Sequence, residues 1–241
     1  MHTVQVNLFL KEQYILGEPI IATFQAQNLG SEAIGLNLGM RHEEHFTFSL
    51  MDPDKRSISK TRLQREGGSS PSPIFLLYPQ QSHTQTLILD KWLPICIPGL
   101  YEMEWSGPIL RQIPEEVLSG RERFIVKPRN AEYLENLCAD LAQKALVPPV
   151  GNKEACTLLG WVRDPIAIPH IVTVCQGIHV YSEFGRTVLA QEIIPGLRRI
   201  GTEEAIAVLN QLKAVRGLEP VLLESEIELA EGNFQRPLAI D

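Results

Sequence analysis

The stretch RFIVKPRNAEYLENLCADLAQKA, residues 123–145, contains the change of pattern that decides the fold. Before Pro128, apolar residues alternate with polar ones, as at Tyr101, Met103 and Trp105, which is the period of a β-strand, and Phe124 and Val126 are expected in the last strand. After Pro128, apolar residues recur every three or four positions, as in an α-helix, at Leu134, Leu137, Cys138, Leu141 and Ala145. The sequence therefore predicts two domains, an all-β domain over residues 1–128 and an all-α domain over residues 129–241.

Toward the N-terminus, the alternating pattern continues in about eight short segments separated by turn residues. This spacing is typical of a β-sandwich. Residues 64–73, QREGGSSPSP, are too rich in Gly, Ser and Pro to form a strand, and we expect a loop there.

Three motifs in this half resemble bacterial immunoglobulin-like domains. They are YILGEPI at residues 14–20, YPQQS at 78–82, and PGLY at 98–101, which would turn into a strand with an inward tyrosine. The resemblance covers roughly residues 4–127 and implies an immunoglobulin-like β-sandwich, a fold that by itself implies no function. The segment 106–120 is longer than a simple hairpin needs, and the cysteine pair of antibody domains is missing.

The helical half contains an internal repeat with an offset of 38 residues. Asp164, which precedes Pro165, is expected to cap a helix, and Thr202 takes the same place in the second copy. The matching apolar pairs are Leu159 with Leu197, Val162 with Ile200, Ala167 with Ala205, Ile168 with Ile206, Ile171 with Leu209 and Val174 with Leu212. A period of this length indicates the stacked helix pairs of a solenoid.

The segments LGWVRDPIAIPHI, residues 159–171, and LRRIGTEEAIAVL, residues 197–209, resemble HEAT-like repeats. This resemblance covers about residues 131–230 and implies a short α-solenoid of about three helix pairs. Pro195 falls inside the helix expected over residues 182–199 and should kink it, because proline removes one backbone donor.

Charge and hydropathy exclude several classes of partner. Residues 1–128 carry 12 basic and 14 acidic side chains, a net charge of −2, and residues 129–241 carry 10 and 15, a net charge of −5. Neither half has the basic footprint that nucleic acid or an anionic membrane requires. No apolar run approaches the roughly 20 residues of a membrane span, so we expect no membrane insertion.

The N-terminal residues 1–11 alternate and do not form the continuous apolar core of a signal peptide. The sequence therefore favours a cytoplasmic location by default. Export stays open for the case that a signal has been removed.

No group of residues argues for a metal, a cofactor or catalysis. The four cysteines show no CxxC spacing and are expected to be buried thiols. In the segment 41–45, RHEEH, the two histidines would point to opposite faces of an extended chain, so an exposed loop is favoured over a metal site. His170 and His179 are interpreted as helix-end or turn histidines, and Glu115-Glu116 as a solvated turn. We therefore predict that the protein is not an enzyme.

One helix suggests a binding surface. Tyr181, Phe184, Val188 and Ile193 form a stripe at helical spacing that is expected to pack in the core. The predicted partner-binding residues are Glu183, Arg186 and Gln191 on the opposite face, together with Arg163. Arginine is favoured at protein interfaces. We therefore predict a non-enzymatic protein–protein interaction or scaffold module that binds through the solenoid groove, the sandwich surface or both.

Two other functions stay open. Some HEAT-like proteins with similar repeats are associated with bilin attachment, so the resemblance also allows a lyase-like chaperone for a tetrapyrrole. An accessory carbohydrate-binding module is a further alternative, with Trp92, Tyr101 and Trp105 as residues that could stack on sugars, although their alternation places Tyr101 and Trp105 in the core.

The two-domain interpretation predicts the course of limited proteolysis. A protease should cut first within residues 64–73 or near 128–130, because these segments have the composition of loops and linkers. Mass spectrometry of the first fragments measures this, and a first cut within residues 165–215 would contradict the stacked repeats.

Overall fold

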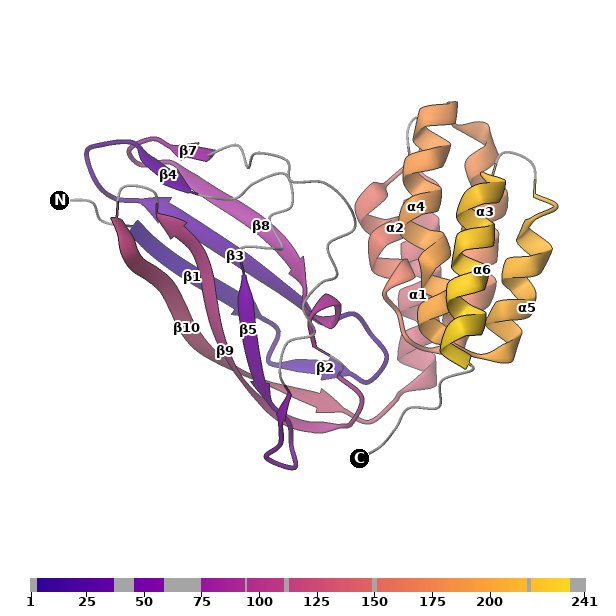
Figure 1. The fold of residues 1–241 in the computed structure, drawn as a ribbon, viewed down its shortest axis with the longest axis horizontal. Coiled ribbons are helices and arrows are strands. Elements are labelled where there is room, and N and C mark those ends of the chain that lie inside the picture. Colours follow the sequence, from indigo (N-terminus) through magenta and orange to yellow (C-terminus); the bar gives the residue numbers. More distant parts are fainter. Residues whose placement is uncertain are drawn as a thin grey trace. The chain divides into compact units, whose positions relative to one another are not determined.

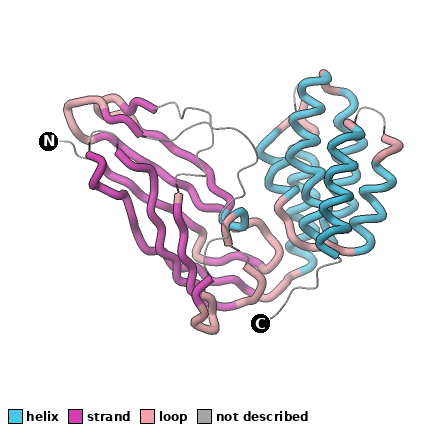
Figure 2. The backbone as a smooth tube through the Cα atoms, viewed as in Figure 1, coloured by secondary structure: helices cyan, strands magenta, loops and turns pink. Residues whose placement is uncertain are grey.

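The computed structural model describes residues 4–36, 46–58, 75–93, 95–110, 113–148, 151–215 and 218–234. Strands form the N-terminal half and helices the C-terminal half (Figure 1; Figure 2). The chain divides into two compact units, a β unit of residues 1–16 and 20–128 and a helical unit of residues 17–19 and 129–241. The predicted loop 64–73 and the histidine segment 41–45 lie outside the described residues.

A three-stranded antiparallel sheet forms one layer of the β unit. Its order is β1 (Val4–Leu10), β3 (Ile21–Asn28) and β8 (Ser82–Ile88). The central strand β3 pairs with each neighbour in an unbroken register, which places Leu8, Phe24 and Gln85 in one row. Because strand side chains alternate between faces, the central strand buries Ala22, Phe24 and Ala26 completely.

The second sheet has the order β2 (Gln13–Ile15), β10 (Ile113–Lys127), β9 (Gly99–Leu110), β4 (Ile34–Leu36) and β7 (Phe75–Leu77). Strand β5 (Thr47–Met51) pairs with β9 and with the short β6 (Ser57–Ile58). Strand β2 runs parallel to β10, whereas the other pairs are antiparallel.

The segment 106–120 extends a long β9–β10 hairpin. Its register shifts between the pairs at Ile113, Val117 and Ser119, which accommodates the extra length. Glu115 and Glu116 belong to β10, so their assignment to a turn was wrong.

Both sheets contribute to one hydrophobic core. Aromatic rings dominate it: Phe24 packs edge-on against Phe46, and Tyr101 stacks on Phe124 at a centroid distance of 5.4 Å. The Tyr101 hydroxyl in this core donates to the Ile97 carbonyl at 2.7 Å, whereas the buried Nε1 atoms of Trp92 and Trp105 have no hydrogen-bond partner among the described residues. After β8, the 3-10 turn η2 (Leu89–Lys91) brings Asp90 to accept from the Ile20 amide at 2.7 Å.

The described part of the helical unit contains six α-helices: α1 (Ala131–Ala145), α2 (Lys153–Gly160), α3 (Ile168–Gly177), α4 (Glu183–Ile200), α5 (Glu203–Leu212) and α6 (Pro220–Phe234). Two 3-10 turns, η3 (Pro165–Ala167) and η4 (Ile178–Val180), flank α3. The predicted caps Asp164 and Thr202 are confirmed, because each side chain accepts a backbone N–H at the start of η3 or α5, and Asn130 caps α1 in the same way.

The 38-residue repeat reappears in the core of this unit. Ala167 and its counterpart Ala205 are fully buried, as are Ile171 and its counterpart Leu209. Asp164 and Thr202 cap equivalent positions, at the start of η3 and of α5. The pairs Leu159–Leu197 and Val174–Leu212 are also buried, whereas Ile200 and Ile206 are only partly buried although their counterparts Val162 and Ile168 are buried.

Helices α2 and α4 cross at two glycines. A Cβ on Gly196 would lie 2.8 Å from the Gly160 Cα, and a Cβ on Gly160 would lie 2.5 Å from the Glu192 carbonyl oxygen. Pro195 lies inside α4, next to this crossing. Only glycine permits the two backbones to approach this closely.

Asp164 is a buried carboxylate with a complete set of donors. Arg129 donates through Nε and Nη2, at 2.5 and 3.0 Å, and the Ile166 amide donates at 3.0 Å. The hydrogen bond from Arg129 is the main reason that the pKa of Asp164 lies below its usual value of 3.8. The pair therefore ties the start of the helical unit to the cap of η3.

Three of the four cysteines are buried, as predicted. Burial raises the pKa of Cys138, Cys156 and Cys175 to about 12. Cys96 is exposed, so its assignment to the core was wrong. It lies in the irregular segment between η2 and β9, where no strand directs the side chain inward.

The glycine crossing predicts a large loss of stability for Gly196→Ala. The added methyl cannot avoid the Gly160 backbone, so we expect about 2 kcal/mol of destabilisation in urea unfolding. Gly185→Ala in the same helix is the control, because its Cβ would meet only the Ser182 hydroxyl at 3.3 Å and the Tyr181 Cβ at 3.5 Å. Equal stability of the two variants would contradict the crossing.

The Asp164 pair predicts an acid-sensitive contribution to stability. Because the pKa is depressed in the folded state, the stabilisation is present above about pH 4 and is lost as the pH falls through the folded value. Asp164→Asn should cost about 2 kcal/mol at pH 7 in urea unfolding, and the difference from the unmodified chain should shrink in acid. Asp140→Asn removes an exposed pair with Lys144 and should cost little. A constant deficit at every pH would argue against this account.

Candidate partner-binding surface

The structure separates Arg163 from the other predicted partner-binding residues. Glu183, Arg186 and Gln191 lie in the N-terminal half of α4, whereas Arg163 lies in the turn between α2 and η3, beside the Trp161 ring. Arg163 is close enough to Arg199, near the far end of α4, to lower its pKa. Arg186 and Arg199 are 13 positions apart, or about 20 Å along a helix. The four residues therefore do not form one surface.

Arg163 belongs instead to a cluster around Trp161. The Arg199 guanidinium lies 3.9 Å from the Trp161 ring centroid and donates to the Gly160 carbonyl at 2.8 Å. Burial, together with the charges of Arg198 and Arg163, lowers the pKa of Arg199 to about 10. These contacts indicate that the cluster has a structural role, because it caps the C-terminal end of α2.

The start of α4 exposes apolar side chains. Phe184, Val221 and Val180 are 81%, 75% and 68% exposed, more than any other large hydrophobic residue in the described ranges. Helices α4 and α6 pack side by side (Figure 1), and Thr187 donates to Glu219 at 2.9 Å between their first turns. Phe184 precedes Thr187 by one turn and Val221 follows Glu219 by two residues. We call Val180, Phe184 and Val221 the apolar tip.

The exposure of Phe184 corrects the predicted core stripe. Tyr181 and Ile193 are buried as expected, but Phe184 is not. Tyr181 has ψ of 166° and stands outside the helix, which begins after the cap residue Ser182. The spacing of three between Tyr181 and Phe184 is therefore not a helical spacing. Ser182, a serine before an acidic residue, was the signal in the sequence for this boundary.

Charged and polar groups surround the apolar tip. Glu183 and Gln191 are exposed, and Arg186 is partly buried. The Arg186 Nε is inaccessible to solvent and has no hydrogen-bond partner. A guanidinium has only donors, and an acceptor from a partner would reach this nitrogen only after the side chain moved.

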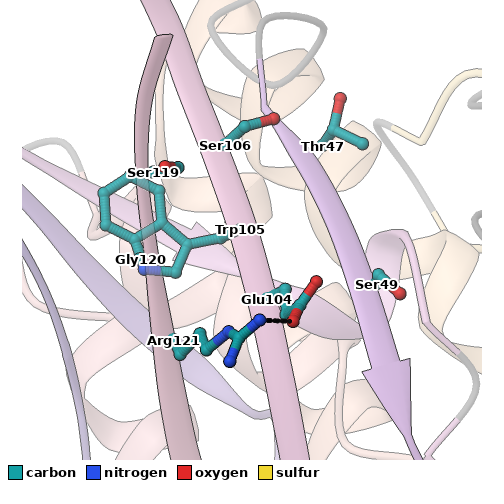
Figure 3. A pocket seen from close by; sticks show the side chains of 8 residues that line it. All are labelled: Thr47, Ser49, Glu104, Trp105, Ser106, Ser119, Gly120 and Arg121. Atoms are coloured by element: carbon teal, nitrogen blue, oxygen red, sulfur yellow. Dashed lines mark ion pairs between the residues drawn. The ribbon is translucent and has the colours of Figure 1, made fainter.

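A second polar surface lies on the β5–β9–β10 face (Figure 3). A pocket of about 400 Å³ is lined by Thr47, Ser49, Glu104, Trp105, Ser106, Ser119, Gly120 and Arg121. The register aligns Thr47, Ser106 and Ser119 in one row across the strands, and Ser49, Glu104 and Arg121 in the next. Arg121 pairs with Glu104 at 2.8 Å, so the charges compensate each other. The pocket thus offers hydroxyls and the Glu104–Arg121 ion pair for polar contacts.

The remaining sequence candidates have structural partners. His170 lies 2.9 Å from Glu135 and joins α3 to α1, and His179 bonds the Gln176 carbonyl within its own turn.

Within the described ranges, no three potential metal ligands come together, and no helix has the length and hydropathy needed to cross a bilayer. Trp92, Tyr101 and Trp105 are at most 4% exposed, so these rings are not available to stack on a sugar.

Comparisons with known proteins identify no relative. No protein-family model and no curated protein matches the chain. Solved structures with weak likeness include a beta-glucosidase from Listeria innocua, at 14% identity and a TM-score of 0.30, over 54% of this chain and 16% of that one. A CARDB domain from Pyrococcus furiosus, solved with di-metal ions, gives 8% identity and a TM-score of 0.31, over 54% and 96%. A mutant of Salmonella alpha-2-macroglobulin gives 10% identity and a TM-score of 0.31, over 97% and 17%. The function therefore has to be argued from the chain itself.

Proposed function

We propose that this chain is a non-enzymatic protein-binding module that engages its partner through the apolar tip of the helical unit. The observation that carries the proposal is the 81% exposure of Phe184 at the start of α4, with Val180 in the preceding η4 and Val221 at the start of α6 also exposed. In this proposal, the β unit is an immunoglobulin-like sandwich that acts as a rigid platform. The helical unit is a short HEAT-like solenoid that presents the partner surface.

Energetics favour the tip over the other surfaces. Burial of a Phe side chain contributes roughly 1.5–3 kcal/mol to association, whereas an exposed ion pair such as Glu104–Arg121 contributes about 1 kcal/mol or less. Binding hot spots combine an aromatic anchor with arginine and a polar rim. Phe184 supplies the anchor, Arg186 an arginine with an unused donor, and Glu183 and Gln191 the rim.

The proposal predicts that Phe184→Ala abolishes most of the affinity. The intact chain and its variants are used as bait, and the protein captured by the intact chain is then titrated by biolayer interferometry. We expect Phe184→Ala to weaken binding about 30-fold and Arg186→Ala about tenfold.

Two control variants separate the tip from other effects. Tyr78→Ala removes a 53% exposed aromatic ring from the β unit and should leave the affinity unchanged. Arg163→Ala should also leave it unchanged, since this residue lies in the turn between α2 and η3, near Arg199 at the far end of α4 from Phe184. An affinity that survives Phe184→Ala, or falls equally with Tyr78→Ala, would refute binding through the tip.

A further inference from the structure

The three-stranded sheet carries no charged residue. Strands β1, β3 and β8 contain no Asp, Glu, Lys or Arg, although these make up 21% of the chain. Their side chains on the face away from the core are Gln5, Asn7, Phe9, Ile21, Thr23, Gln25, Gln27, Ser82, Thr84, Thr86 and the buried Ile88. An ordinary surface with roughly 25–35% charged residues would place about three charges among eleven positions.

The second sheet, in contrast, has features that prevent its edges from pairing with another chain. Its exposed face carries Glu104 against Arg121 and Glu102 against Arg123. Its terminal strands β2 and β7 have three residues each. Short edges and charged side chains are two devices that prevent a sheet from pairing with another chain. The three-stranded sheet lacks both, because β1 and β8 have seven residues each.

Of the two edge strands of this sheet, β1 and β8, strand β1 has the composition that favours pairing with another strand. Its sequence VQVNLFL has high β propensity, no charge, no Pro and no Gly, which is the composition of segments that pair with copies of themselves. All seven residues pair with β3, and in the described chain β1 has no strand on its other side. Within the described residues, this edge is thus not hydrogen-bonded to a strand, although β10 of the second sheet comes close to β1.

The core-facing side chains of β1 are incompletely covered. Val4, Val6 and Leu10 pack against the core but stay partly exposed, whereas Ala22, Phe24 and Ala26 on the neighbouring strand β3 are fully buried. A further strand beside β1 would cover this row. In contrast, the core-facing residues of β8 include the polar His83 and Gln85.

We propose that β1 pairs antiparallel with β1 of a second copy of this chain. A two-fold axis at Asn7 pairs all seven residues, with Asn7 opposite Asn7, Gln5 opposite Phe9, Val6 opposite Leu8, and Val4 opposite Leu10. The two sheets then form one six-stranded sheet. The interface is isologous, the commonest arrangement for a homodimer. Each chain has a net charge of −7, but no charged residue of β1 enters the contact.

This surface lies in the β unit and is independent of the apolar tip. Self-association is measured by sedimentation equilibrium of the full chain from micromolar to near-millimolar concentration, because one strand pair makes a small interface. We expect a reversible dimer. Asn7→Lys sets two ammonium groups against each other and should weaken the dimer roughly tenfold or more. Thr84→Lys, with the same charge on the same face of the opposite edge, should dimerise like the unmodified chain.

A charge swap tests the register. Asn7→Lys and Asn7→Glu variants should each be monomeric alone but form a heterodimer when mixed, since opposite charges then meet at the axis. Thermal unfolding verifies that both variants fold. A monomeric unmodified chain, loss of the dimer with Thr84→Lys, chains longer than a dimer, or no rescue on mixing would each overturn the proposal.

Discussion

A carboxylate removed from water must keep its hydrogen-bond donors, and Asp164 imposes this requirement on the helical unit. Its two oxygens hold the Arg129 side chain and the Ile166 amide, so the first residue after Pro128 and the start of η3 are fixed to one point. The apolar repeat then continues from that point into α3. Replacement of any of these groups would leave either a buried charge or an open helix end.

The close approach of the α2 and α4 backbones is a second local constraint on the helical unit. The contact of Gly160 with Gly196 brings α2 and α4 together without side chains between them, and the Arg199 guanidinium then covers the end of α2. Because this end of α4 is occupied by structural contacts, the opposite end is the part of the helix that remains open to a partner. The division between a packed end and an exposed end thus arises from the positions of the small residues.

Most of the element pattern could be predicted from the sequence, because periodicity and capping are local properties. Asn130, Asp164 and Thr202 identify where helices or 3-10 turns begin, and the 38-residue offset identifies which positions are buried. The pairing of strands is not local, so β2 and β6 and the long β9–β10 hairpin were missed. Phe184 was misplaced because the stripe counted Tyr181 as if it were helical, whereas Tyr181 is extended and the helix begins only after Ser182.

The thiols have a practical consequence for experiments on this molecule. Cys138, Cys156 and Cys175 are protonated at neutral pH and enclosed by helices, whereas Cys96 is accessible. Since a maleimide reacts with an accessible thiolate, the native chain should accept a single dye without any engineered cysteine. A fluorophore attached there would report on the β unit from a defined position and leave the helices untouched.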